Sequence, residues 1–499
     1  MKQFDYDVAI LGGGSAGYAA ARTAAGAGLK TVVIEGGEEI GGLCILRGCM
    51  PTKALLYAAE VMHLASHPEP WGIQPGKVRF DLRKVMARKN ALIQDFADHR
   101  VKQLNSGKFK FIRANTRFLD AHTVELNSSR SSGRQPAPFN QSRHTSAATL
   151  TAAHFVIATG SNVAPSPLPQ LREIGYLTSD DALVLNKLPK SLIILGGGAV
   201  ACEFAQFFAR FGVKVTLIQR SEHILKEFDT DAGAEIEKVF RREGVKVYTG
   251  TKLVGARLVA RASRPSESRR QDARATTKTV SFEHRGKIVR ASAEEILFAL
   301  GRAPNTASLG LEKAGVKTEK GRIVANEFMQ TSAPHIYAAG DCTGPHEIVH
   351  IAVQQGEIAA HNIAHPDAQR KMDYRLVISI VFTEPQVAFV GLTEKEAMAR
   401  GIPFLAASYP FNDHGKSLIM EAKDGFVKLL AEPKTGEILG GSCVGPVGGE
   451  LLHEIVAAMA KRMTVHELAV MPHYHPTLAE IWTYPAEELA AEVRPIKAA

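Results

Sequence analysis

The strongest constraint on the fold is a pattern that occurs twice: an apolar strand, a glycine-rich turn and a helix of small residues. It occupies residues 6–35 and again residues 191–219. In such a unit the glycines permit a tight turn and let phosphate groups approach the start of the helix. The strand that follows the helix ends beside the ribose of the bound nucleotide. Two units of this kind predict an α/β chain with two Rossmann-like domains, one for each of two dinucleotides.

The first unit has every residue that the pattern requires. We expect strands at residues 6–10 and 30–34, with a helix between them that ends near residue 26. Glu35 ends the second strand, where its carboxylate is placed to accept a hydrogen bond from a ribose hydroxyl. The predicted contact residues in the turn are Gly12, Gly14, Ser15, Ala16 and Gly17.

The second unit begins with a strand at residues 192–195. Its turn contains Gly196 and Gly198 and has an alanine in place of the third glycine. A helix at residues 202–211 and a strand at residues 214–218 are expected to follow. One dinucleotide can then be held tightly by the first unit, while the other exchanges at the second.

The residues after this last strand bear on the choice of nucleotide. Where an acid would accept from a 2′-hydroxyl, the chain has Gln219, followed by Arg220 and later by Lys226. An acid would repel a 2′-phosphate, whereas cations attract it. The pattern therefore favours NADPH, with NADH as the alternative, and the other interpretation is that both cations are ordinary surface residues.

Two cysteines, Cys44 and Cys49, follow a pair of glycines and precede a helix-forming run at residues 53–63. In an ideal helix, Cα atoms at this separation lie roughly 8–9 Å apart. A disulfide needs about 4.4–6.8 Å. A bridge would therefore require a distorted turn, for which Gly48 would supply the conformational freedom.

The spacing of the cysteines alone leaves several interpretations open. A zinc half-site would need a second pair of ligands, but the other three cysteines are isolated in the sequence. A structural disulfide is typical of secreted proteins, and no signal peptide precedes the motif. A redox-active pair and two buried thiols remain as interpretations.

The wider segment, Gly-Gly-x-Cys-x4-Cys-x-Pro-x-Lys at residues 41–53, resembles the active-site signature of the FAD-dependent pyridine nucleotide–disulfide oxidoreductases. This family includes dihydrolipoamide dehydrogenase, glutathione reductase and mercuric reductase, and its motifs recur from residue 8 to residue 480. The resemblance implies a redox disulfide between Cys44 and Cys49. Cys49 would face the flavin and form a charge-transfer thiolate, and Cys44 would attack the substrate.

The resemblance also implies roles for residues elsewhere in the chain. Lys53 would pair with Glu203 beside the flavin N5. The segment from His475 to Glu480 looks like the family's acid/base pair, which serves the disulfide of a partner subunit in a homodimer. An imidazole can exchange thiol protons near neutral pH, and a carboxylate fixes its tautomer. We expect no role for the neighbouring His473.

Further motifs resemble those that hold the cofactor in this family. Gly340 and Asp341 end a strand, and the aspartate would bind the ribityl chain of FAD. The remaining predicted cofactor contacts are Gly42, Thr159, Gly160, Gly301 and Arg302. The predicted domains are an FAD-binding domain in two parts (1–163 and 299–372), an NAD(P)H-binding domain (164–298) and a C-terminal α+β dimerisation domain (373–499).

Composition and charge exclude other classes of function. No apolar run approaches the roughly 18 residues of a membrane span. Most of the net charge of +9 lies in two segments rich in Ser, Arg, Pro and Thr, residues 127–150 and 256–278, which we interpret as solvated insertions. We therefore expect no nucleic-acid binding, no membrane association and no metal site, and we expect a cytoplasmic enzyme.

The substrate is the least constrained part of the prediction. Glutathione reductases carry an arginine where this chain has Glu357, which would repel a glutathione carboxylate, although Arg22 matches another glutathione contact. No cysteine follows His475, whereas mercuric reductases usually have a C-terminal pair. The sequence therefore favours a dihydrolipoamide dehydrogenase-like enzyme for a disulfide, dithiol or lipoyl substrate. A metal-ion or quinone reductase and a non-enzymatic flavoprotein subunit are the alternatives.

Overall fold

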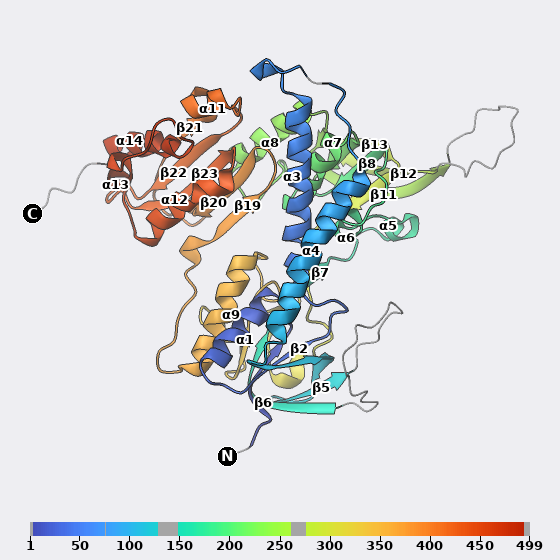
Figure 1. The fold of residues 1–499 in the computed structure, drawn as a ribbon, viewed down its shortest axis with the longest axis vertical. Helices are drawn as coiled ribbons and strands as arrows, with labels where there is room; N and C mark the ends of the chain where they lie inside the picture. Colours follow the sequence, from blue (N-terminus) through green and yellow to red (C-terminus); the bar gives the residue numbers. More distant parts are fainter. Residues whose placement is uncertain (1–2, 75, 128–147, 261–275, 494–499) are drawn as a thin grey trace, which may run out of the picture. The chain divides into compact units, whose positions relative to one another are not determined.

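A computed structural model of the chain describes residues 3–74, 76–127, 148–260 and 276–493 (Figure 1). These residues form two compact units, each assembled from separate segments of the chain. The first comprises residues 1–52, 87–165 and 302–372, and the second comprises residues 53–86, 166–301 and 373–499. Helices α3 (Cys49–Ser66) and α4 (Leu82–Leu104) each contribute residues to both units.

The divisions between these two units fall after residues 52, 86, 165, 301 and 372, and the assignment of residues to FAD-binding, NAD(P)H-binding and dimerisation domains stays a prediction. Residues 53–86, which we expected in the first domain, group with the second unit instead. The nucleotide assigned to each domain remains a prediction.

The first unit is built on a seven-stranded sheet in the order β3-β2-β1-β6-β5-β4, with β18 also paired to β6. Strands β1, β2, β3 and β18 are parallel to their neighbours, and the apolar runs of β1, β2 and β18 are buried on both faces, as is typical of parallel sheets. The strands described in the first unit, including four that lie outside this sheet, are β1 (Tyr6–Leu11), β2 (Thr31–Glu35), β3 (Lys110–Arg113), β4 (Asn115–Phe118), β5 (Thr123–Asn127), β6 (Ala148–Ile157), β7 (Ser161–Val163), β15 (Arg302–Pro304), β16 (Thr318–Glu319), β17 (Arg322–Ile323) and β18 (Ile336–Ala338).

Two helices of the first unit, α1 (Ser15–Gly26) and α9 (Val349–Ala364), lie side by side (Figure 1). Small residues allow this close packing. A side chain on Gly356 of α9 would have its Cβ 2.2 Å from the carbonyl oxygen of Ala16. The short helices α2 (Gly42–Leu46) and η2 (Leu311–Ala314) complete the unit.

The second unit contains a four-stranded parallel sheet in the order β10-β9-β8-β14 and a three-stranded antiparallel sheet, β11-β12-β13. Aromatic side chains of α7 fill the core beside the parallel sheet, among them Phe204, Phe207 and Phe208. The elements are η1 (Glu69–Trp71), α5 (Pro169–Ile174), α6 (Ser179–Ala182), β8 (Ser191–Leu195), α7 (Ala199–Arg210), β9 (Lys214–Ile218), α8 (Thr230–Arg242), β10 (Lys246–Tyr248), β11 (Thr251–Ala260), β12 (Thr276–His284), β13 (Lys287–Ala293) and β14 (Glu295–Phe298).

The C-terminal part of the second unit is a five-stranded antiparallel sheet in the order β19-β20-β23-β22-β21. Helices α12 and α14 pack against it around the buried Trp482 (Figure 1). The elements are η3 (Tyr374–Leu376), β19 (Ile378–Val381), β20 (Gln386–Gly391), α10 (Glu394–Ala399), β21 (Leu405–Pro410), η4 (Phe411–Asp413), α11 (Gly415–Ile419), β22 (Phe426–Ala431), β23 (Ile438–Gly445), α12 (Gly448–Ala460), α13 (Val465–Val470), η5 (Ala479–Trp482) and α14 (Thr483–Glu492).

The structure corrects our interpretation of the two basic segments. Residues 148–150 belong to β6, and residues 256–260 and 276–278 are paired in register between β11 and β12. Lys278 is not a solvated cation, because its Nζ lies 2.5 Å from a carboxylate oxygen of Glu295. The remaining residues, 128–147 and 261–275, lie outside the described part of the chain.

Candidate functional site

The first glycine turn joins β1 to α1 and is tightly packed. Gly12 has a φ of +107°, and a Cβ there would lie 2.4 Å from the carbonyl oxygen of Ala158. A Cβ on Gly17 would lie 1.8 Å from the carbonyl oxygen of Gly12. Gly14 is the N-cap of α1 and supplies no side-chain hydrogen bond, so Ser15 and Ala16 begin a helix without a side-chain cap. This arrangement suits an anionic ligand at the helix start.

Glu35 faces this turn from the end of β2. Its carboxylate accepts hydrogen bonds from the backbone N–H of Gly13 at 2.7 Å and from that of Gly37 at 2.6 Å. Two carboxylate oxygens have about four acceptor sites, so capacity remains for a ribose hydroxyl. The side chain is half-buried at the position that the sequence predicted.

Two further predicted residues of the first unit fit a bound cofactor. A Cβ on Gly42 would lie 2.7 Å from the Cα of Gly14, so the first residue of α2 packs directly on the glycine turn. The hydroxyl of Thr159, which follows β6 together with Gly160, is buried and has no hydrogen-bond partner in the structure. Buried polar atoms are rarely left unsatisfied. A cofactor with polar groups at this place would supply the missing partner.

Arg302 and Asp341 meet through a residue that the sequence analysis did not single out. The Ser161 hydroxyl donates to Asp341 at 2.6 Å and accepts from Nε of Arg302 at 2.7 Å. The neighbouring Gly340 and Gly301 both have positive φ angles, +79° and +117°. Ser161 directly follows the predicted Thr159–Gly160 pair, but no motif marked it.

The two cysteines lie on either side of a break between two helices. Cys44 is in α2, and Cys49 is the first residue of α3, which spans 18 residues. The break is at Arg47, whose φ is −142°, and Gly48 does not have a positive φ. Gly48 instead allows a close approach, because a Cβ there would lie 3.0 Å from the carbonyl oxygen of Leu43. Both cysteines are half-buried thiols in the structure, so their disulfide stays a prediction.

The second glycine turn repeats the first between β8 and α7. Gly196 has a φ of +116°, and Gly198 is the N-cap of α7. The side chain of Gln219, which is 8% exposed, lies across the turn, with its Cγ 2.9 Å from where a Cβ on Gly197 would be. Arg220 and Lys226 are exposed, and Lys226 has one acid nearby, Glu227, at 3.8 Å. The structure therefore leaves these cations accessible to a phosphate.

Lys53 and Glu203 form an ion pair within the second unit. Nζ of Lys53 lies 2.8 Å from both carboxylate oxygens of Glu203 and 4.6 Å from the ring centre of Phe382. Glu203 is 2% exposed, and it also accepts a hydrogen bond from the backbone N–H of Phe382. The sequence resemblance implied this pair, and the structure brings the two residues together.

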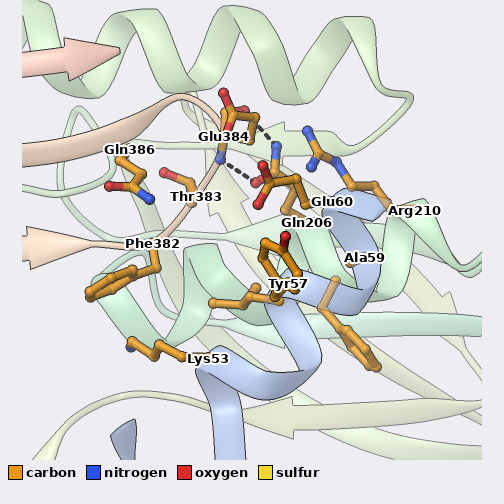
Figure 2. Close-up of a pocket in the computed structure, with 12 residues that line it drawn as sticks. Lys53, Tyr57, Ala59, Glu60, Gln206, Arg210, Phe382, Thr383, Glu384 and Gln386 are labelled. Atoms are coloured by element: carbon orange, nitrogen blue, oxygen red, sulfur yellow. Dashed lines mark hydrogen bonds between the residues drawn. The ribbon is translucent and has the colours of Figure 1, made fainter. Parts of the chain in front are cut away.

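A cavity of 230 Å³ lies beside this ion pair, and Lys53 lines one side of it (Figure 2). Gln206 of α7 exchanges two hydrogen bonds of 2.7 Å with the backbone of Glu384 at the cavity wall. Burial, together with the negative charge of Glu60, raises the pKa of Glu384 to about 7. Nothing in the sequence pattern marked this carboxyl, because its burial depends on contacts between distant segments.

His475 and Glu480 form the predicted pair near the C-terminus. Nδ1 of His475 lies 2.9 Å from one carboxylate oxygen of Glu480 and 3.2 Å from the other. The His475 side chain is 77% exposed, whereas that of Glu480 is 11% exposed. His473 lies instead in a separate pair, with Nε2 2.6 Å from Glu454. The carboxylate thus contacts Nδ1 of an imidazole that is largely exposed to solvent.

The described residues lack two other kinds of feature, a metal-binding cluster and a membrane-spanning helix. No three His, Cys, Asp or Glu side chains in that part of the chain group in a way that could hold a metal ion. None of the helices described has the length and apolar character needed to cross a membrane.

Comparison with known proteins decides the family. Residues 6–356 match the pattern described as pyridine nucleotide-disulphide oxidoreductase, and residues 377–486 match the dimerisation domain of the same family. The chain belongs to the pyridine nucleotide-disulphide oxidoreductase family. Members of this family are FAD-dependent enzymes that use NADH or NADPH, and the chain is a flavoprotein disulfide oxidoreductase.

Individual relatives cover nearly the whole chain. Dihydrolipoyl dehydrogenase of Bacillus subtilis is 36% identical over 95% of this chain and 96% of its own length. Mercuric reductase of Staphylococcus aureus is 31% identical over 95% of this chain and 81% of its own length. Among solved structures, LpdA of Mycobacterium tuberculosis superposes with a TM-score of 0.81 at 27% identity, over 97% of this chain and 99% of that one. The HOCl-induced flavoprotein disulfide reductase RclA of Escherichia coli superposes with a TM-score of 0.79 at 25% identity, over 98% of this chain and 100% of that one.

Proposed function

We propose that this family member is a homodimeric, NADPH-preferring disulfide reductase that resembles dihydrolipoamide dehydrogenase and acts on a small disulfide, dithiol or lipoyl group. The single observation that carries the proposal is the position of Cys49 at the first residue of α3. The N-terminus of an 18-residue helix favours a negative charge, so it stabilises a thiolate there. A stabilised thiolate five residues from a second cysteine is the arrangement that disulfide exchange requires.

The bound flavin would supply two-electron transfer between the nicotinamide and the cysteine pair. The first glycine turn, Glu35, Gly42, Thr159 and Asp341 are the residues that we propose hold it. Lys53 would keep its charge beside the flavin because Glu203 balances that charge in a buried setting. Arg220 and Lys226 would bind the 2′-phosphate of NADPH, and the neutral Gln219 would tolerate that phosphate.

In the reduced enzyme the chain's own residues would carry out disulfide exchange. The Cys44 thiolate attacks one sulfur of the substrate disulfide, which forms a mixed disulfide and releases the other sulfur as a thiolate. The imidazolium of His475 donates a proton to this leaving thiolate, and Glu480 holds the ring in the required orientation. The Cys49 thiolate then attacks Cys44, which releases the second substrate sulfur as a thiolate that takes its proton from solvent, and Cys44 and Cys49 are left as a disulfide.

The exposure of His475 supports its use in a second subunit. Its neighbours Tyr474 and Val470 are 83% and 81% exposed. Such exposure is unusual for large apolar side chains, and also for the surroundings of a catalytic base. On α3, Tyr57, Val61 and Leu64 are also at least half exposed, and their spacing places them on one helix face. We propose that these surfaces are buried in the homodimer and that His475 serves the partner's cysteines.

An ion pair in the first unit bears on the substrate. Arg22 donates a hydrogen bond to Glu357, and both side chains are partly exposed. A carboxylate on the substrate would compete with Glu357 for this arginine. The pair therefore favours a neutral group next to the disulfide, as in a lipoyl amide, over a charged one such as glutathione. Because its cysteine pair suits redox chemistry in a reducing compartment, we also propose a cytoplasmic location.

The proposal is tested by anaerobic titration of the purified holoenzyme with NADPH and, separately, with NADH. We expect a long-wavelength charge-transfer absorbance after two electrons, with NADPH producing it faster. The Cys49→Ser variant should lack it. The matched Cys44→Ser variant should show it before any reduction, because Cys49 then has no partner for a disulfide. Flavin bleaching without this absorbance in the wild type would contradict the proposal.

The alternative within the family is a metal-ion reductase, which the mercuric reductase relatives keep open. It is favoured if Hg(II) in excess thiol stimulates NADPH oxidation more than lipoamide does. The same assay with quinones tests the remaining electron acceptors, and the absence of turnover with every acceptor would favour a non-enzymatic flavoprotein.

A further inference from the structure

A second histidine faces the carboxylate that orients His475. His414 lies between η4 and α11, and its side chain is completely buried. Its Nε2 is 3.4 Å from Oε1 of Glu480. Its Nδ1 is 2.8 Å from the hydroxyl of Ser417, which is also completely buried. Glu480 therefore has an exposed imidazole and a buried imidazole as neighbours.

The chemistry of these groups determines where the protons of His414 lie. An ionised carboxylate only accepts hydrogen bonds, so Nε2 must carry the proton that points toward Glu480. The neutral ring then has a lone pair on Nδ1, which accepts from the Ser417 hydroxyl. Burial lowers the pKa of His414, and the charge on Glu480 opposes this effect only in part. The buried ring is therefore neutral, with a fixed tautomer.

The surroundings hold His414 in place. Phe411 and Tyr484 present their rings at right angles to the imidazole, with centroids 6.4 and 6.3 Å away. Tyr484 in turn stacks on Tyr409 of β21 with 4.0 Å between centroids. The charged or titratable groups that face the ring from the elements packed on it are Glu480, His475, Tyr484 and, through Tyr409, Asp413.

A purely structural role does not account for this arrangement. Core histidines are ordinarily hydrogen-bonded at both nitrogens, yet Nε2 of His414 has no partner at normal hydrogen-bond distance among the described residues. The nearest acceptor is Oε1 of Glu480 at 3.4 Å, which a small adjustment of the side chains would bring within hydrogen-bond distance. A proton relay to solvent is also unsuitable, because both His414 and Ser417 are fully buried.

We propose that His414 is a positioning residue for the His475–Glu480 pair. Its neutral Nε2–H holds the inner oxygen of Glu480, so that the carboxylate stays ionised and fixed while His475 exchanges protons with the substrate thiols. Ser417 fixes the tautomer of His414 that makes this possible. The inference rests on the proposed function, since it assigns a role within the same proton-transfer step.

The test compares His414→Leu, which removes the donor, with His414→Gln, whose amide N–H reaches the position of Nε2. Both are measured as FAD-loaded enzyme over pH 5.5 to 9, with two readouts: the charge-transfer absorbance after two-electron reduction, and kcat and KM with lipoamide. A hydrogen bond to a charged group justifies an expected loss of about tenfold in kcat for His414→Leu, with KM for the nucleotide unchanged. The pH dependence of the absorbance should move by about half a pH unit or more.

Two further variants keep the inference falsifiable. Ser417→Ala removes only a hydroxyl and should reproduce the effect at about threefold, even if His414→Leu fails to fold. His414→Gln should recover to within about threefold of the wild type. Unchanged pH dependence and kcat in His414→Leu or, if that variant does not fold, in Ser417→Ala would overturn the inference while the proposed function stands. If His475→Gln is itself without effect, or the wild type lacks the absorbance, the proposed function fails first and His414 has no step to serve.

Discussion

The two glycine turns have nearly the same backbone and different chemistry. Gly12 and Gly196 have φ angles of +107° and +116°, and a Cβ on either would collide with a carbonyl oxygen at 2.4 or 2.3 Å. The N-caps Gly14 and Gly198 are both extended and both without side-chain caps. The glycines therefore specify a shape that receives a dinucleotide, and they do not say which one.

The differences lie in the residues around this shared shape. Where the first unit has Glu35 bonded to its turn, the second has the neutral Gln219. At the fifth residue of the helix, the first unit has Ala19 and the second has Glu203, each 2% exposed. The first unit can thus pack helix on helix, while the second carries a buried charge that Lys53 must balance. Ligand identity and catalytic charge are properties of these side chains.

The largest expected effect comes from breaking the first turn. Gly17→Ala would place a Cβ 1.8 Å from the carbonyl oxygen of Gly12, which forces the turn apart where the pyrophosphate must approach. We expect the purified variant to retain less than about one tenth of the wild-type flavin. The measurement is flavin absorbance per mole of protein. The matched control is Ala201→Gly in the second unit, which should keep its FAD, and retention of flavin by Gly17→Ala would contradict the prediction.

Removal of the cation beside Glu203 should have the next largest effect. Lys53→Met leaves a carboxylate buried with one remaining hydrogen bond, from the backbone of Phe382. Broken buried pairs cost several kcal/mol, so we expect the free energy of unfolding to fall by about 3 kcal/mol. Chemical denaturation measures it. The double variant with Glu203→Gln should regain part of the loss, and an equally stable single variant would show that the pair is unimportant to folding.

The next prediction concerns the choice of nucleotide, and it tests the difference between Glu35 in the first unit and Gln219 in the second. Replacing Gln219 by Glu and Arg220 by Ala would give the second unit the acid of the first and remove one phosphate contact. We expect the ratio of kcat/KM for NADPH to that for NADH to fall about 100-fold, from lost charge-assisted bonds and new repulsion. Steady-state kinetics with both nucleotides tests it, with FAD content as the control. An unchanged ratio would mean that specificity lies elsewhere.

The smallest effect concerns Glu384, whose backbone is hydrogen-bonded to Gln206. Gln206 occupies the position in α7 that Arg22 occupies in α1 of the first unit. Glu384 has a folded-state pKa of about 7, above its usual 4.5, because it is buried. The folded protein therefore keeps this proton to higher pH than the unfolded chain does. Its contribution to stability is largest below about pH 4.5 and declines as pH rises to about 7. Thermal unfolding between pH 4.5 and 8 should show this decline, and Glu384→Gln should flatten it.

The sequence predicted the elements whose pattern is local. The strands at β1, β2, β8 and β9 and the C-terminal end of α1 follow from apolar runs and glycine punctuation, and each lies within one residue of its expected place. The helices α3 and α7 begin three or four residues earlier than expected, at Cys49 and Ala199, because the motif residues themselves form the first turn. Strand β21 and helices α13 and α14 were missed, since short amphipathic segments carry little periodic signal.

The candidate site divides in the same way. Cys44, Cys49, Lys53 and His475 stood in recognisable motifs, whereas Ser161, His414 and Glu384 did not. These last three acquire their surroundings from segments far away in the chain. Ser161 meets Asp341 across 180 residues, and Gln206 meets Glu384 across 178. Such contacts depend on the assembled fold, and no spacing within one stretch of sequence indicates them.

The order of pairing in the first sheet affects how the chain can be synthesised. Strand β6 has β1 on one side, and on the other side β5 pairs with its first residues and β18 with Phe155 to Ile157; β18 ends at Ala338. At ordinary rates of translation, β18 would leave the ribosome on the order of half a minute after β1. Until then one edge of β6 has unpaired backbone groups that could pair with another nascent chain. A newly made polypeptide of this kind would depend on chaperones, and a fragment that stops short of residue 338 would be a poor candidate for separate expression.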